Sequence, residues 1–291
     1  MKVFKTILNF VVITVLSILL IVYIGLNIFS KTLLSKDYIL TKMEENNYYE
    51  KLVEYVNSSF ENYIYQSGLD EEVIKNIVTE EKIKSDTNAI IDNVYEGKEF
   101  SVDTQSIKDK LLSNISDSIN GRSFSATEQK AVDAFANNIC SAYEDTLLHT
   151  NYMQKIHSVY SQITEYKDLA NKIILGGSVV CVILLMLINI KEKAKILSTL
   201  AIAVLVAGAF LILLNVYIKA KININNIVIF SDAISEIVVK IISNILEQIM
   251  NNGIIYTIIG FVGIVISSIF SSKNIEEKNW LWKYMASLRV S

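Results

Sequence analysis

Four long stretches of the sequence are apolar and carry no charge. They run from Ile7 to Phe29, Ile173 to Ile190, Ile196 to Ile218 and Gly253 to Phe270, and none contains Asp, Glu, Lys, Arg or His. Since about 20 apolar residues in a helix cross a bilayer core of roughly 30 Å, each stretch is long enough for one crossing. The mean hydropathy of +0.38 and the absence of proline agree with this. The sequence therefore predicts an all-α membrane protein with four transmembrane helices.

The four stretches divide the 291 residues into nine predicted segments. In chain order these are 1–6 as a cytoplasmic N-terminus, 7–29 as the first span, 30–172 as an extracytoplasmic helical bundle, 173–190 as the second span, 191–195 as a cytoplasmic turn, 196–218 as the third span, 219–252 as an extracytoplasmic amphipathic helix, 253–270 as the fourth span and 271–291 as a cytoplasmic juxtamembrane tail.

The distribution of basic residues predicts the orientation. The segments assigned to the cytoplasm carry Lys2, Lys5, Lys191, Lys193, Lys195, Lys273, Lys278, Lys283 and Arg289, against three lysines in the short loop 219–252. Cytoplasmic loops are rich in Lys and Arg, and long domains are translocated largely regardless of charge, so segment 30–172 is left out of the comparison. We expect both termini in the cytoplasm and residues 30–172 outside. If segment 30–172 is counted, the bias disappears and the opposite orientation stays open. We expect the chain to lie in the plasma membrane. Its many lysines and two arginines are typical of a bacterium with an AT-rich genome.

The long segment 30–172 is acidic and reads as helix almost throughout. It holds 24 acidic and 15 basic residues, a net charge of −9. Gly68, Gly97 and Gly121 suit helix C-caps. Asp70 begins an acidic helix start, and the sequence from Ser125 to Glu128 matches a capping box. We expect helices over about 35–66, continuing the first span, and near 70–95 and 103–120.

A heptad pattern begins after Ser125. Residues three and four positions apart in alternation are Val132, Phe135, Ile139, Ala142, Thr146, His149, Met153, Ile156, Tyr160, Ile163, Lys167 and Ala170. Such a repeat is typical of coiled-coil packing. It predicts one unbroken helix from about residue 125 into the second span. The packing residues of this helix are expected to be Val132, Phe135, Ile139, Met153, Ile156, Tyr160 and Ile163.

Segment 231–250 is amphipathic, with an isoleucine-rich face and polar side chains on the others. It is acidic, so attraction to anionic lipid is absent, and packing on the base of the bundle is favoured over lying on the outer leaflet. In the tail, Trp280, Trp282 and Tyr284 have the chemistry of membrane-interface anchors, although they could also form a docking site for a cytosolic partner.

Small residues recur in the spans at spacings that let helices approach closely. They are Gly177, Ala203, Ala207, Gly263 and Ser267. Packing within one chain and packing between copies are both compatible with this pattern.

The sequence offers little chemistry. His149 and His157 lie eight residues apart, roughly 12 Å along one helix, too far to share an ion. No motif for a metal, a cofactor, a phosphate loop or a nucleophilic serine is present. Cys140 and Cys181 are too few for a disulfide framework, and the spans lack the charged residues of ion relays. The near-balanced charge of −3 argues against nucleic acid as a partner. We expect no catalytic, cofactor or metal site.

These features favour a non-enzymatic protein of the cell envelope. Its acidic helical ectodomain would act as an interaction, sensing or scaffold module, with the lipid bilayer and either a protein partner or a second copy of the chain as its contacts. The alternative is a subunit of an oligomeric channel or permease complex. Its layout is similar to that of tetraspan channel and junction proteins, without a shared motif. An extracytoplasmic or membrane-embedded enzyme is the third, least favoured possibility.

Overall fold

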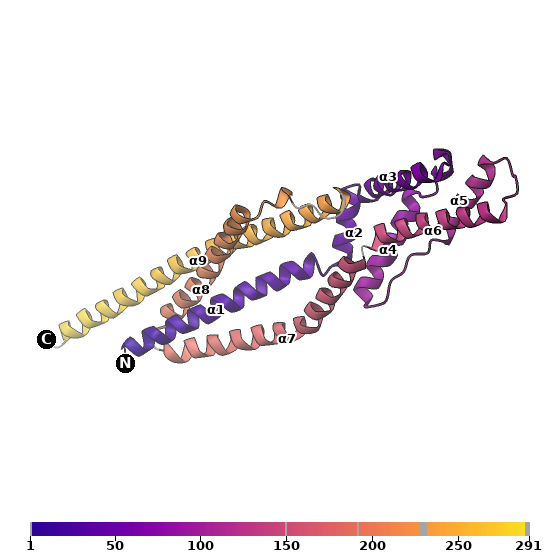
Figure 1. The fold of residues 1–291 in the computed structure, drawn as a ribbon. Helices are drawn as coiled ribbons and strands as arrows, with labels where there is room; N and C mark the ends of the chain where they lie inside the picture. Colours follow the sequence, from indigo (N-terminus) through magenta and orange to yellow (C-terminus); the bar gives the residue numbers. More distant parts are fainter. Residues whose placement is uncertain (1, 149, 191, 227–231, 289–291) are drawn as a thin grey trace. The chain divides into compact units, whose positions relative to one another are not determined.

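The computed structural model describes residues 2–148, 150–190, 192–226 and 232–288 (Figure 1). Within these ranges, the side chains of residues 2, 150–157, 159, 225, 232 and 273–288 are not described. Every regular element in the described ranges is helical and none is a strand. Four helical segments of this part are long and apolar enough to cross a membrane, namely Val3–Lys31, Tyr160–Ile188, Lys193–Lys221 and Ala233–Ser272. The predictions of an all-α fold and of four candidate spans are confirmed.

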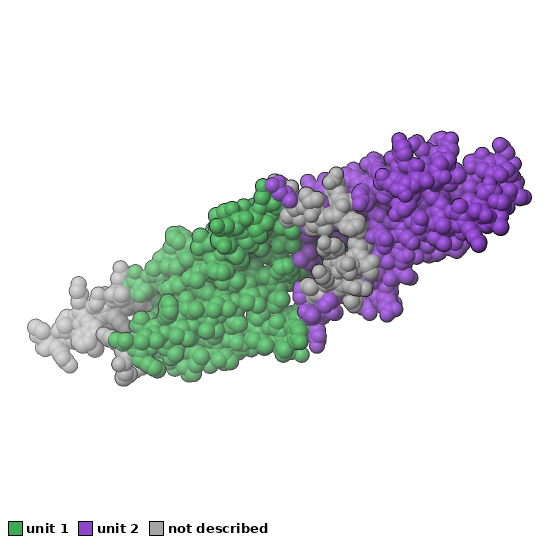
Figure 2. All heavy atoms as spheres, in the orientation of Figure 1, with its two compact units in different colours: residues 1–31, 166–225, 242–291 green, residues 32–165, 226–241 purple. Residues whose placement is uncertain are grey.

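The chain forms two compact units, coloured separately in Figure 2. Unit 1 consists of residues 1–31, 166–225 and 242–291, and unit 2 of residues 32–165 and 226–241. Unit 1 contains 14 basic and 5 acidic residues, a net charge of +9, whereas unit 2 contains 13 basic and 25 acidic residues, a net charge of −12. The charge of the whole chain is small only because these opposite charges nearly cancel.

Unit 1 contains α1 (Lys2–Lys31), α8 (Lys193–Lys221) and parts of two longer helices, α7 (Thr150–Ile188) and α9 (Asp232–Leu288). Its core joins three helices through Val12, Leu16, Cys181, Leu185 and Ala203. Large apolar side chains remain exposed around this core, among them Phe10, Leu187, Leu213 and Phe261. A monomer in water rarely exposes so much apolar surface, and lipid would cover it.

Unit 2 contains α2 (Lys36–Glu45), α3 (Tyr48–Ser67), the 3₁₀ turn η1 (Glu71–Ile74), α4 (Glu80–Glu96), α5 (Gln105–Ser118) and α6 (Ala126–Leu148). It also includes the first turns of α7 and α9. Helix α3 packs against α4 and α6, and α5 packs against α6. The largest fully buried side chains of this unit include Leu52, Val56, Phe60, Ile83, Ile107, Leu111, Ile115, Ile139 and Tyr143.

The predicted helix over 35–66 is wrong at two places. Helix α1 ends at Lys31, and Ser35 then caps α2 by accepting a hydrogen bond from the backbone N–H of Tyr38. A second break follows α2, where Asn47 adopts the left-handed conformation with φ of 51°. Asparagine tolerates this conformation better than most residues, so Asn46 and Asn47 end α2 without a glycine or a proline.

The segment 70–95 is also divided. Asp70 does cap a helix start, through the N–H of Glu72, but only the single turn η1 follows, and Asn76 then has a positive φ of 56°. Thr79 begins α4 by capping Lys82. The C-caps predicted at Gly68 and Gly97 are confirmed, with φ of 72° at both.

Other helix ends agree in part with the prediction. The capping box is confirmed, because the N–H of Ser125 donates to Glu128 Oε2 at 2.8 Å and the N–H of Glu128 donates to Ser125 Oγ at 3.3 Å. Gly121 has a φ of 70° but lies beyond the cap of α5, which is Ile119.

The helix predicted from residue 125 into the second span consists of α6 and α7. Helix α6 ends at Leu148 and α7 begins at Thr150, and the join at residue 149 lies outside the described residues. From Thr150 to Ile188, α7 is one helix that contains the second half of the heptad pattern and most of the second apolar stretch.

The predicted boundaries at residues 252 and 270 are not helix ends. Helix α9 runs without interruption from Asp232 to Leu288 and includes the amphipathic segment, the fourth apolar stretch and most of the tail. The chain has no proline, and a single glycine such as Gly253 costs a helix only about 1 kcal/mol. The Asn-Gly sequence at 252–253 is therefore too weak a signal to end a helix of this length. The amphipathic segment meets protein, since Glu236 forms an ion pair with Lys51 of α3.

Candidate functional site

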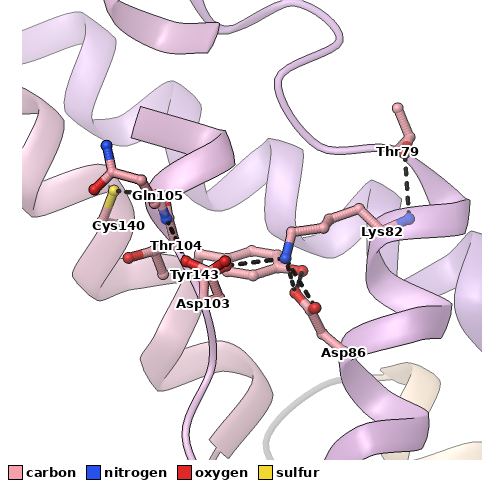
Figure 3. A network of polar contacts seen from close by, with 8 residues as sticks. All are labelled: Thr79, Lys82, Asp86, Asp103, Thr104, Gln105, Cys140 and Tyr143. Atoms are coloured by element: carbon pink, nitrogen blue, oxygen red, sulfur yellow. Dashed lines mark hydrogen bonds and ion pairs between the residues drawn. The ribbon is translucent and has the colours of Figure 1, made fainter. Parts of the chain in front are cut away.

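A polar cluster of unit 2 joins α4, α6 and the chain between α4 and α5 (Figure 3). The Tyr143 hydroxyl of α6 donates to Asp86 Oδ2 at 2.7 Å, and Lys82 Nζ lies 2.8 Å from the same carboxylate. The Lys82 ammonium also donates to the backbone carbonyl of Asp103 at 2.9 Å. One buried tyrosine, one carboxylate and one ammonium thus connect three parts of the chain.

The chain that enters α5 carries further bonds of this cluster. The carboxylate of Asp103 accepts a hydrogen bond at 2.9 Å from the N–H of Gln105, the first residue of α5. The Cys140 thiol of α6 donates to the Thr104 carbonyl at 3.7 Å. These contacts hold the start of α5 against α6.

The protonation states of this cluster suit a structural role. Burial and the neighbouring Asp86 carboxylate raise the pKa of Tyr143, so its hydroxyl keeps its proton and serves as a donor. Burial raises the pKa of the Cys140 thiol, which disfavours the nucleophilic thiolate. The cluster therefore holds the helices together through hydrogen bonds, and its groups are in protonation states that suit packing and not catalysis.

A polar groove lies between α3 and α6 in the same unit. It has a volume of about 430 Å³ and is lined by Tyr55, Ser59, Asn62, Tyr63, Gln66, Ala142, Asp145 and Thr146. The Ser59 and Thr146 hydroxyls donate to carbonyls of their own helices, at 2.6 and 2.7 Å. The groove therefore offers two tyrosines, two amides and one carboxylate.

Three of these groups are available to a ligand. The side chains of Asn62, Gln66 and Asp145 are exposed and have no hydrogen-bond partner within the described residues. The Tyr55 and Tyr63 rings are half-buried beside them. Tyrosine flanked by polar groups is enriched at protein–protein interfaces, because its ring is large and rigid and its hydroxyl can still form a hydrogen bond.

The residues predicted to pack in the heptad pattern differ in their surroundings. Val132 and Phe135 are buried and Ile139 is fully buried in α6. In α7, Ile163 is half-buried, and the half-buried Tyr160 ring lies 4.7 Å from the Tyr95 ring of α4. The side chains of Met153 and Ile156 lie outside those that the structure describes.

The small residues predicted to pack in the spans lie at helix contacts of unit 1. Ala203 and Ala207 are buried, and the Ala203 carbonyl accepts a hydrogen bond from Ser17 of α1 at 3.0 Å. Ser267 of α9 donates to the Ala194 carbonyl of α8 at 2.6 Å. A Cβ atom at Gly263 would lie 2.8 Å from that of Ala201, and one at Gly177 would lie 3.1 Å from the Leu19 side chain.

Two further contacts of the spans were missed by the sequence analysis. The side-chain amides of Asn9 and Asn189, both buried, donate to each other's oxygen at 3.4 and 2.9 Å. At Gly208 and Gly260 the backbones of α8 and α9 lie so close that a Cβ atom would be 2.5 Å from a backbone nitrogen of the other helix. The only sequence signal for the asparagine pair was one asparagine near the start of the first apolar stretch and one near the end of the second. Because 180 residues separate these two positions, the pattern did not predict their contact.

The remaining predicted positions have no described side chains. Trp280, Trp282 and Tyr284 belong to α9 by their backbone, and their side chains lie outside the described ones. The same holds for His157, and residue 149 is not described at all. Within the described part of the chain, no group of three His, Cys, Asp or Glu side chains is placed to hold a metal ion.

Comparison of the chain with protein-family models, with curated proteins and with solved structures finds no match.

Proposed function

We propose that the chain is a non-enzymatic integral membrane protein of the cell envelope. In this proposal unit 1 crosses the bilayer, and unit 2 stands outside it as an interaction, sensing or scaffold module. The polar groove between α3 and α6 is the contact surface for a protein partner or for a second copy of the chain. The observation that carries the proposal is that this groove presents two amides and a carboxylate that have no hydrogen-bond partner within the described residues, beside two tyrosines.

The charge of unit 2 supports this role and indicates the chemistry of the partner. A net charge of −12 attracts basic surfaces and speeds their encounter. Asp145 places one of these negative charges in the groove itself. We therefore expect a partner that brings a lysine or an arginine to the groove.

The contrast with the polar cluster of Figure 3 also supports this assignment. There, Lys82, Asp86 and Tyr143 bond to one another or to nearby backbone, so their bonding capacity is used within the fold. In the groove, Asn62 and Asp145 face outward without such partners within the described residues. Exposed polar groups such as those of the groove, whose hydrogen-bonding capacity is not used within the fold, are the ones that a partner can bind.

The alternative, a channel or permease subunit, has less support. Polar side chains that line a pore would face water, whereas Ser17, Asn189 and Ser267 are buried and bond to neighbouring helices of the same unit. These bonds are typical of helix packing in a membrane.

The orientation is tested by reporter fusions to the full-length chain. We expect a reporter after residue 100 to be active outside the cell and one after residue 193 to be active in the cytoplasm. The reverse pattern would place unit 2 in the cytoplasm and contradict the proposal.

The partner surface is tested by photo-crosslinking in intact cells, with a benzophenone amino acid at Tyr63. The matched control is the same label at Tyr65, which is 88% exposed and does not line the groove. We expect an adduct from position 63, absent from position 65, that weakens in Asp145→Lys. An adduct of twice the 32.8 kDa chain mass identifies self-association, and any other mass identifies a different protein. Equal labelling from both positions, or none from position 63, would contradict the assignment.

A further inference from the structure

A second groove lies in unit 1, between α1 and the part of α7 that belongs to the same unit. Its volume of about 620 Å³ is in the range of small-molecule and cofactor sites. The lining residues are Leu19, Leu20, Tyr23, Leu26, Asn27, Ser30, Lys31, Lys167, Asn171, Ile174, Leu175 and Ser178.

The lining changes from apolar to cationic along the groove. Helix α1 supplies leucines at 19, 20 and 26, then a polar end that finishes at Lys31. Helix α7 supplies Ile174 and Leu175, one hydroxyl beyond them at Ser178, and a polar end at Lys167. From residue 19 to residue 31 the helix rises roughly 18 Å, which is more than half of a bilayer core. The groove is therefore amphiphilic on the length scale of a lipid molecule.

The charged end of the groove is positive. Lys31 and Lys167 both line it, no acidic residue does, and neither lysine forms an ion pair within the described residues. Asp168, beside Lys167 in sequence, is exposed and does not line the groove. Asn27 and Asn171 add amide N–H donors at the same end. Two ammonium groups with nearby amides can bind a phosphate that carries a net negative charge.

We propose that this groove binds one anionic phospholipid, with its phosphate between Lys31 and Lys167 and an acyl chain along the leucines of α1. The apolar half lies on two candidate spans, which selects a lipid over a soluble phosphate. The site belongs to the leaflet that meets the C-terminal end of α1, and it does not depend on the partner-binding role of unit 2.

Native mass spectrometry of the purified, delipidated full-length protein tests this site. The probes are phosphatidylglycerol, which is anionic, and phosphatidylcholine, which has no net charge. We expect one phosphatidylglycerol to bind in preference to phosphatidylcholine. The double variant K31Q/K167Q is expected to bind phosphatidylglycerol about 25-fold more weakly, since each basic residue near an anionic headgroup contributes roughly fivefold. Its binding of phosphatidylcholine should not change.

The control K172Q/K221Q removes the same charge from exposed lysines of unit 1 that do not line the groove, and it should bind phosphatidylglycerol as the unchanged protein does. Ser178→Phe, which fills the apolar half without a change in charge, should weaken both lipids. Circular dichroism checks that each variant folds, and the serine variant tests the site if the lysine variant does not fold. Equal binding of both lipids, equal losses in the two lysine variants, or full displacement by inorganic phosphate would overturn the proposal.

Discussion

The contact between α8 and α9 depends on glycines that allow the two backbones to touch. A Cβ atom at Gly208 would lie 2.5 Å from the backbone nitrogen of Thr257 and 2.7 Å from the Gly253 carbonyl oxygen. A Cβ atom at Gly260 would lie 2.5 Å from the backbone nitrogen of Leu205. Ordinary van der Waals contact begins at 3.4 Å, so alanine at either position forces the helices apart by about 1 Å.

The size of the effect follows from two opposing contributions. Overpacking costs about 1 to 3 kcal/mol, and the upper end applies because the obstructing atoms are backbone and cannot rotate away. Alanine also has a helix propensity about 1 kcal/mol better than that of glycine. We therefore expect Gly208→Ala and Gly260→Ala each to lower the free energy of unfolding by about 2 kcal/mol.

The full-length protein in detergent micelles, unfolded with increasing dodecyl sulfate and followed by circular dichroism, gives this free energy. Gly25→Ala and Gly176→Ala are matched controls, because within the described residues no atom beyond the neighbouring turns of the same helix lies within 4 Å of a Cβ at either position. They should unfold at the same or a higher dodecyl sulfate fraction than the unchanged protein. If Gly208→Ala and Gly260→Ala unfold with the controls, the close contact of α8 and α9 is wrong.

Two predictions concern unit 2. Tyr143→Phe removes the donor to the Asp86 carboxylate and should lower the free energy of unfolding by about 2 kcal/mol, as for a hydrogen bond to a charged group. Thermal melting measures this loss. An equally large loss in the exposed control Tyr65→Phe would contradict the prediction. The capping bonds from Ser125 lower the pKa of Glu128 from 4.5 to about 2, so this carboxylate stabilises the fold above pH 4.5 and loses that effect as the pH falls toward 2. Acid titration followed by circular dichroism should show a smaller stability loss over this range in Glu128→Gln, and identical curves would show that the cap is not coupled to folding.

Local rules were sufficient for many features of the fold. The four candidate spans follow from apolar composition and length, and the capping box from four consecutive residues, Ser125 to Glu128. Gly68 and Gly97 end helices because glycine adopts positive φ at little cost. In each case the deciding interaction lies within one stretch of chain, so the sequence pattern contains the whole cause.

The errors arose where weak local signals compete. Asn47 and Asn76 adopt positive φ and interrupt helices that the sequence analysis expected to continue, whereas Asn57 and Asn88 lie inside helices. Asparagine is compatible with both states at small cost, so the tertiary contacts select the outcome.

Composition and periodicity by themselves determined that this chain is helical, that it has four segments able to cross a membrane, and that its charge is concentrated in one part. Both grooves, the paired amides of Asn9 and Asn189 and the bond from Tyr143 to Asp86 were decided only by tertiary structure. The physical reason is distance along the chain. A helix forms from neighbours a few residues apart, while a groove or a buried polar pair exists only after helices distant in sequence have packed together.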